Sequence, residues 1–236
     1  MKIKTLYIII LAVILISFCV VMYSAFSNIA VKASNELCDT KPLIVIDAGH
    51  GGEDGGAEVE GVLEKNINLS ISNKLADTLR LCGYKVKEIR DEDISVYDDD
   101  ADTLREKKVS DLKNRVELFN SDDDNIVISI HQNKFDNSAY SGTQVFFSVN
   151  NEKSRVLGEA IRNSVIQLIQ NDNTRELKPA NSDIYILNNS KVPAVIVECG
   201  FLSNPTERSK LLDDNYQSDM AYSIAMGVLE YIEAEK

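Results

Sequence analysis

Two histidines, His50 and His131, are the only imidazoles in this chain of 236 residues. Each ends a short apolar run, at residues 43–50 and 126–131, and Glu198 ends a third run that begins at residue 194. Apolar runs of this length predict buried strands. Because the carboxyl ends of parallel strands meet at one edge of a sheet, we expect the three polar side chains to lie close together there.

A second carboxylate, Glu64, follows His50 by 14 residues and opens a predicted helix. Two imidazoles and one carboxylate around an open fourth position form a typical catalytic zinc site. We therefore predict His50, Glu64 and His131 as Zn²⁺ ligands. Glu198 is the predicted general base, because a carboxylate in an apolar strand is costly to bury without a chemical role.

Each of these residues also has a purely structural interpretation. A single histidine is more often structural than metal-binding. Glu64 can be a first-turn carboxylate that the helix dipole favours, and Glu198 can be the buried partner of a salt bridge. The combined pattern favours the metal site over these separate explanations.

The first histidine lies in a glycine-rich loop, residues 47–56. A phosphate-binding P-loop needs Lys and then Ser or Thr after its glycines, and the dinucleotide fingerprint needs a glycine where Asp54 stands. Neither pattern is present, so the glycines are expected to let the backbone turn and expose His50. The helical zinc motifs of common peptidases are absent as well.

Hydrophobic periodicity predicts alternating strands and helices. Such alternation favours an α/β fold in which a mainly parallel, twisted sheet carries helices on both faces of a single domain. Residues 91–102 are expected to form a solvated acidic loop; a calcium-binding loop is the alternative, although the EF-hand spacing is absent. The predicted strands are 43–47, 84–89, 126–131, 142–148, 184–187 and 194–199, and the predicted helices are 65–82, 109–120, 152–170, 205–212 and 216–234.

The N-terminus predicts export. Lys2 and Lys4 precede an uncharged apolar run of 21 residues, 6–26, which is long enough to cross a bilayer as a hydrophobic helix. Residues 1–33 are therefore interpreted as a membrane anchor or a cleavable signal peptide. Residues 34–42 follow as a linker and 43–236 as the catalytic domain, placed outside the cytoplasm.

Charge and cysteine usage narrow the function further. The formal net charge of −12 argues against a nucleic-acid partner. Cys38 and Cys82 can form a disulfide outside the cell, although spacing alone does not establish the pair. Cys199 is interpreted as a small buried hydrophobe, with a zinc thiolate or a nucleophile as the alternative.

Four motifs in order resemble the zinc-dependent N-acetylmuramoyl-L-alanine amidases of the type 3 class. They are Ile-Asp-Ala-Gly-His-Gly-Gly at 46–52, the Glu64 segment, Ser-Ile-His-Gln-Asn at 129–133 and Val-Glu-Cys-Gly-Phe-Leu-Ser-Asn-Pro at 197–205. The resemblance covers about residues 43–233. It implies cleavage of the amide between N-acetylmuramic acid and L-alanine in peptidoglycan, with zinc on the first three positions and Glu198 as the catalytic glutamate. Asn133 becomes a further candidate for binding substrate.

Only 66 residues separate His131 from Glu198, so no wall-binding repeat or autoinhibitory insertion is expected. A module-free, membrane-anchored member resembles the germination-specific amidases of endospore formers, which strip stem peptides so that muramic lactam forms in the spore cortex. Two alternatives stay open. One is another exported zinc peptidase, such as a carboxypeptidase that uses Arg90 or Arg115 to bind a terminal carboxylate; the other is a catalytically dead wall-binding protein. The sequence identifies no protein partner or regulator.

Overall fold

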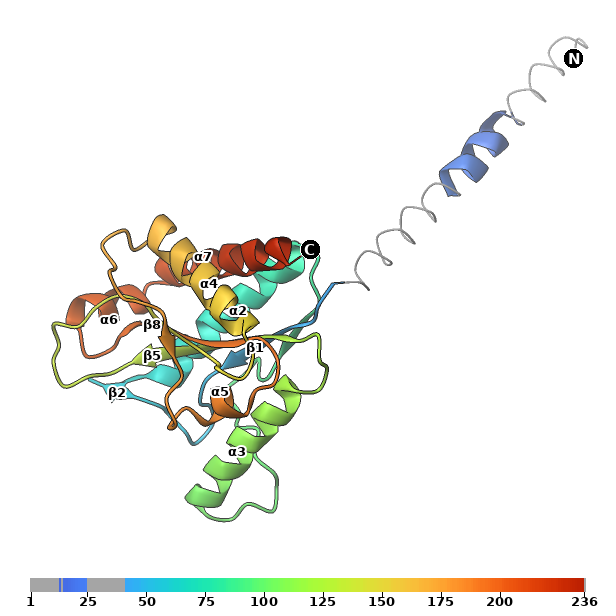
Figure 1. Cartoon of the computed structure of the whole chain (residues 1–236). Coiled ribbons are helices and arrows are strands. Elements are labelled where there is room, and N and C mark those ends of the chain that lie inside the picture. Colours follow the sequence, from blue (N-terminus) through green and yellow to red (C-terminus); the bar gives the residue numbers. More distant parts are fainter. Residues whose placement is uncertain (1–12, 14, 25–40, 236) are drawn as a thin grey trace, which may run out of the picture. The chain divides into compact units, whose positions relative to one another are not determined.

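The computed structural model describes residues 13, 15–24 and 41–235. The chain divides into two units, Met1–Lys41 and Pro42–Lys236. The second unit contains a six-stranded sheet with the order β4-β1-β5-β8-β6-β7; Figure 1 labels its central strands β1, β5 and β8. Its strands are β1 (Ile44–Ala48), β4 (Val86–Glu88), β5 (Ile126–Asn133), β6 (Gln144–Phe147), β7 (Lys178–Pro179) and β8 (Ala194–Phe201).

The predicted mainly parallel sheet is confirmed. Strands β4, β1, β5 and β8 run parallel to one another. Strand β6 pairs antiparallel to β8, and the short β7 pairs parallel to β6. A separate hairpin consists of β2 (Glu58–Val59) and β3 (Val62–Leu63). The carboxyl ends of β1, β5 and β8 therefore lie next to one another.

Helices cover both faces of the sheet, as predicted (Figure 1). On one face lie α2 (Glu64–Leu81), α4 (Lys153–Leu168) and α7 (Asp214–Ala234), and on the other lie α3 (Leu104–Phe119) and α5 (Tyr185–Asn189). The short α6 (Pro205–Leu211) follows β8. Two apolar cores result, one under each helical layer.

Alternation along the central strands decides which side chains reach which core. In β1, Ile44 and Ile46 enter the α2–α4–α7 core, whereas Val45 enters the α3–α5 core. Successive side chains of a strand point to opposite faces. Carried to the strand ends, this rule puts four polar side chains on the α3–α5 face: Asp47, Ser129, His131 and Glu198.

The segment 184–187, predicted as a strand, instead begins helix α5, with Ile184 as the N-cap. The prediction was wrong because a short apolar run does not distinguish a strand from a buried helical turn. Asn181 Oδ1 accepts a hydrogen bond from the backbone N–H of Asp183 at 3.0 Å and turns the chain. The consecutive residues Ile186 and Leu187 then both pack into the α3–α5 core, which alternation in a strand would prevent.

Helix α3 begins five residues before the predicted start at 109, because a capping box fixes its N-terminus. Thr103 Oγ1 accepts from the Glu106 backbone N–H at 3.2 Å, and Glu106 Oε2 accepts from the Thr103 backbone N–H at 2.9 Å. Two helical donors are satisfied reciprocally. The preceding acidic segment is an irregular loop, as predicted.

In the N-terminal unit, residues 15–24 are helical, with exposed apolar side chains. Within the described ranges, no helix has the length and apolar character needed to cross a bilayer. The rest of the predicted anchor or signal peptide, the linker up to residue 40 and Cys38 lie outside the described residues. The Cys38–Cys82 disulfide therefore stays a prediction; Cys82 is exposed at the C-terminal cap of α2.

Candidate metal centre

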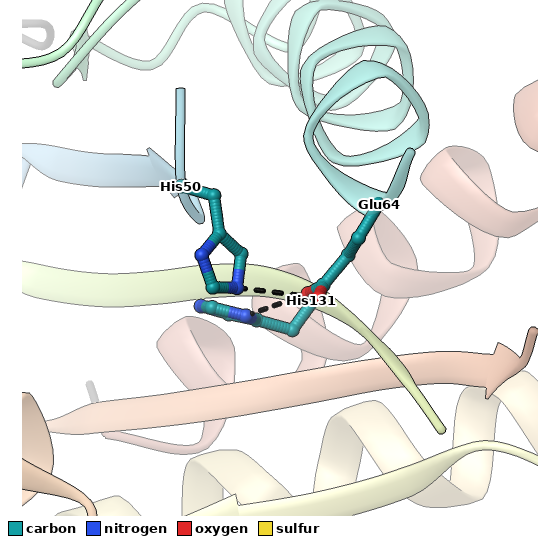
Figure 2. Close-up of side chains that lie close together, drawn as sticks. All are labelled: His50, Glu64 and His131. Carbon is teal, nitrogen blue, oxygen red and sulfur yellow. Dashed lines mark hydrogen bonds and ion pairs between the residues drawn. The ribbon is translucent and has the colours of Figure 1, made fainter. Parts of the chain in front are cut away.

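The three predicted ligands come together at the carboxyl edge of the sheet (Figure 2). One ligand atom from each of His50, Glu64 and His131 lies within 4.8 Å of the other two. Glu64 stands between the imidazoles: its Oε2 lies 3.2 Å from His50 Nε2, and its Oε1 lies 2.9 Å from His131 Nδ1. The arrangement offers two nitrogens and one carboxylate to a single cation.

Helix α2 presents Glu64 as its first residue, and four donors orient the carboxylate besides His50. Oε1 accepts from His131, from the Gln132 backbone N–H at 3.0 Å and from Asn68 Nδ2 at 3.2 Å. Oε2 accepts from the Ala57 backbone N–H at 2.8 Å. Burial alone would raise the pKa of Glu64, but the bonds from His131 and His50 hold it well below the usual range. The carboxylate is therefore an anion throughout the physiological pH range.

His50 follows β1 in a left-handed conformation with φ 62°, which is uncommon for a residue other than glycine. Its Nδ1 faces Asp54 Oδ2 at 2.9 Å. Because a carboxylate accepts, this bond places a proton on Nδ1 and turns Nε2 toward the centre. Burial alone would lower the pKa of His50, but its bonds to Asp54 and Glu64 raise it to about 9. Without a metal, the ring is cationic at neutral pH, and a cation must displace that proton.

Two glycines leave space for the ligand side chains. A Cβ on Gly49 would lie 2.2 Å from His131 Cε1 and Nε2. A Cβ on Gly56, where φ is +67°, would lie 2.6 Å from Glu64 Oε2 and 2.7 Å from His50 Cδ2. Gly49 and Gly56 are therefore needed because ligand side chains occupy the positions that their own side chains would take.

Two buried arginines fix the start of this loop. Arg90 donates to the carbonyls of Ala48 and Gly49 at 2.9 and 3.0 Å. Arg115 donates to the carbonyls of Ala48 and His50 at 3.1 and 2.8 Å, and it pairs with the buried Asp47. Each arginine is only 2% exposed. Because both guanidiniums are engaged by loop carbonyls, the structure gives no support to the suggestion that either binds the terminal carboxylate of a substrate.

Glu198 lies beside His131, its partner in the β5–β8 register. Burial raises the pKa of its carboxyl group to about 7; nearby Glu64 adds to the rise and His131 opposes it. The Oε2 atom is buried and has no hydrogen-bond partner within the described residues. The alternative of a salt-bridged Glu198 finds no support, and the arrangement is suited to moving a proton near neutral pH.

Cys199 and Asn133 occupy neighbouring positions with different surroundings. Cys199 is fully buried in the α2–α4–α7 core, and burial raises the pKa of its thiol. The interpretation as a small buried hydrophobe is therefore supported over a thiolate. Asn133 ends β5, and its carbonyl accepts from the Leu202 N–H at 2.8 Å; its substrate role stays a prediction.

A cavity of about 210 Å³ adjoins the centre between α3 and α5. The residues that line it include His50, His131, Lys108, Asp183, Tyr185 and Ile196. Both apolar and charged side chains therefore line the cavity next to the imidazoles. This lining is suited to a polar substrate.

The sequence did not reveal the residues that orient the ligands. Asn68 bridges Glu64 Oε1 and the Gly49 carbonyl, at 3.2 and 3.1 Å. Its position four residues after Glu64, on the same face of a helix, is a signal that could have been used. Asp54 had no comparable signal, because only the turn of the glycine loop brings it to His50.

Comparisons with known proteins agree with this centre. A family profile described as N-acetylmuramoyl-L-alanine amidase matches residues 44–230. The germination-specific N-acetylmuramoyl-L-alanine amidase of Bacillus subtilis is 33% identical over 189 residues, which are 80% of this chain and 79% of that protein. The CwlD amidase of Clostridioides difficile, solved in complex with the GerS lipoprotein, has a TM-score of 0.78 and 37% identity over 82% of this chain and 100% of that one. AmiC2 of Nostoc punctiforme has a TM-score of 0.68 and 31% identity, covering 81% and 97%.

Proposed function

Because this chain belongs to the N-acetylmuramoyl-L-alanine amidase family, and is therefore a peptidoglycan hydrolase that acts outside the cytoplasm, we propose that it uses Zn²⁺ held by His50, Glu64 and His131. The reaction cleaves the amide between the lactyl group of N-acetylmuramic acid and L-alanine. The convergence of three ligand atoms within 4.8 Å carries this proposal.

The donor set fits zinc. Two imidazole nitrogens and one carboxylate oxygen leave one coordination position open, as in catalytic zinc sites, whereas Ca²⁺ and Mg²⁺ prefer sites built from oxygen. The Nδ1–H of His50 is oriented by Asp54, the outer partner that zinc-binding histidines usually have. Zn²⁺ bound here would polarise the scissile carbonyl and make a water molecule more acidic.

Glu198 is the proposed general base. Its carboxylate takes the proton of the attacking water and delivers it to the nitrogen of the leaving L-alanine, which departs as an amine. A pKa near 7 suits both steps, since the group accepts a proton readily and releases it readily. Glu64 is unsuited to this duty because its pKa is held well below the usual range.

We also propose a role in the spore cortex, where removal of stem peptides allows muramic lactam to form. The similarity to the germination-specific amidase of B. subtilis supports it. The apolar run 6–26 supports attachment to the membrane or passage through it. The relative solved with the GerS lipoprotein supports an exported protein partner for this chain too.

Digestion of purified peptidoglycan with the purified protein tests the activity. Mass spectrometry should find muramic acid with a free lactyl carboxyl group and stem peptides with a free L-alanine amino group. Released D-alanine would instead indicate a carboxypeptidase, and tight wall binding without products would indicate a scaffold. Expression in an endospore former that lacks its own germination-specific amidase tests the cortex role, since muramic lactam should reappear.

A further inference from the structure

An exposed aromatic surface lies on the loop 134–142, between β5 and β6. Phe135 and Tyr140 are 56% and 43% exposed, and their rings meet edge to face with centroids 5.1 Å apart. The guanidinium of Arg175 lies over the ring of Tyr140 at 5.5 Å and over the ring of the buried Phe201 at 4.4 Å. We call Phe135, Tyr140 and Arg175 the aromatic platform.

The loop that carries this platform is fixed by hydrogen bonds to the segment after β8. The Phe135 N–H donates to Ser203 Oγ at 3.1 Å, and the Tyr140 carbonyl accepts from Asn204 Nδ2 at 3.2 Å. Arg175 Nε donates to the Ser141 carbonyl at 2.6 Å. Exposed aromatic rings on a rigid support lose little conformational freedom when they bind a ligand. The exposed faces of these two rings contribute little to the hydrophobic core, so we attribute them to the binding of a ligand.

The platform and the metal centre lie at the same edge of the sheet. Phe135 follows His131 by four residues, a chain length of at most about 14 Å. Phe201, which supports the platform, follows Glu198 by three residues. Strands β5 and β8 pair at both places, His131 with Glu198 and Asn133 with Phe201. The platform is therefore within reach of a substrate that extends from the metal centre along this edge of the sheet.

We propose that the aromatic platform binds a sugar ring of the glycan strand, next to the muramic acid whose amide is cut. This inference rests on the proposed function. The lactyl group is a short link, so the glycan must stay close to the metal centre during cleavage. A pyranose ring has an apolar C–H face that packs against an aromatic ring, whose face carries partial negative charge. Its hydroxyl and acetamido oxygens accept hydrogen bonds from a planar guanidinium such as that of Arg175.

Two variants test this role without touching the metal centre. Tyr140→Ala and Phe135→Ala remove exposed rings, and Tyr222→Ala removes an exposed tyrosine on α7, 51% exposed, as a matched control. Calorimetry measures the binding of glycan oligosaccharides that carry no stem peptides. We expect each platform variant to weaken this binding by about tenfold, the loss of one well-packed ring, while Tyr222→Ala binds like the wild type. On polymeric peptidoglycan, KM should rise by a similar factor with kcat little changed.

The outcomes separate this inference from the proposed function. If the wild type cleaves peptidoglycan but the platform variants bind glycan and cleave it like the wild type, the platform proposal is wrong and the amidase stands. If the wild type cleaves no amide yet binds glycan through the platform, the amidase proposal is wrong and the platform proposal stands. If the variants lose only their association with an exported partner protein, the platform is a protein-docking surface and the sugar assignment is overturned. Unchanged melting temperatures show that the variants are folded.

Discussion

Replacing Glu198 by glutamine should abolish most hydrolysis and leave metal binding intact. The amide preserves the shape of the side chain, and Oε2 has no hydrogen-bond partner among the described residues that the substitution could remove. What disappears is the group that accepts the proton of water, a contribution of about 10²–10⁴-fold to kcat. The pKa of about 7 means that the wild-type carboxylate is present for a large part of the time at neutral pH, so the full effect should be seen there.

Glu64→Gln is the matched variant with the opposite expectation. Both oxygens of Glu64 face backbone donors, Gln132 N–H at Oε1 and Ala57 N–H at Oε2. A glutamine amide has one oxygen, so either orientation directs its NH₂ group at one of these donors. An unpaired buried donor costs about 1–3 kcal/mol. This mismatch lowers the stability of the folded protein with or without metal, whereas the loss of the anionic ligand is what weakens metal binding.

Metal content after dialysis, the metal dissociation constant from competition with a chelator, and the release of new L-alanine amino groups are measured on both variants. The expected result is a metal-loaded, inactive Glu198→Gln protein and a metal-poor Glu64→Gln protein. If Glu198→Gln loses its metal while Glu64→Gln keeps it, the roles assigned to the two glutamates are wrong, although the fold and family stand.

Three further predictions concern the same centre. The folded-state pKa of Glu198, about 7, lies above its ordinary value of 4.5, so the metal-free fold loses stability as pH rises from about 4.5 to 7. Glu198→Gln should therefore raise the melting temperature of the metal-free protein at pH 8 by several degrees, which corresponds to a gain of about 3 kcal/mol in the free energy of unfolding. At pH 4 the melting temperature should not change. Equal shifts at both pH values would contradict this. The pKa of His50, about 9 without metal, predicts that zinc binding at pH 7 releases about one proton; calorimetry should give heats that depend on the ionisation enthalpy of the buffer, and buffer-independent heats would refute it. Gly49→Ala should weaken metal binding by at least about tenfold, because its Cβ would lie 2.2 Å from the His131 ring. Gly200→Ala is the control, since its Cβ would meet nothing closer than 3.2 Å. Equal metal affinities of the two variants would show that His131 moves freely.

The sequence by itself determined most elements and the three side chains that converge at the centre. The apolar runs that end at His50, His131 and Glu198 are signals along the chain, and each of these three strands was found close to its predicted bounds, unlike the predicted strand 184–187. Parallel pairing then brings their ends together without further information. The family motifs, confirmed by the match over residues 44–230, added the expected activity. These inferences succeeded because periodicity and motif spacing are local properties of the chain.

Only the tertiary structure decided how the ligands are held. Arg90 and Arg115 became clamps for loop carbonyls because segments 25 or more residues away surround them. The raised pKa of Glu198 depends on burial of its side chain near the end of β8, which residue spacing does not reveal. The aromatic platform assembles side chains from separate segments, including Phe135 and Arg175. Desolvation and hydrogen bonding between distant segments have no local signature, so these features appear only when the chain is folded.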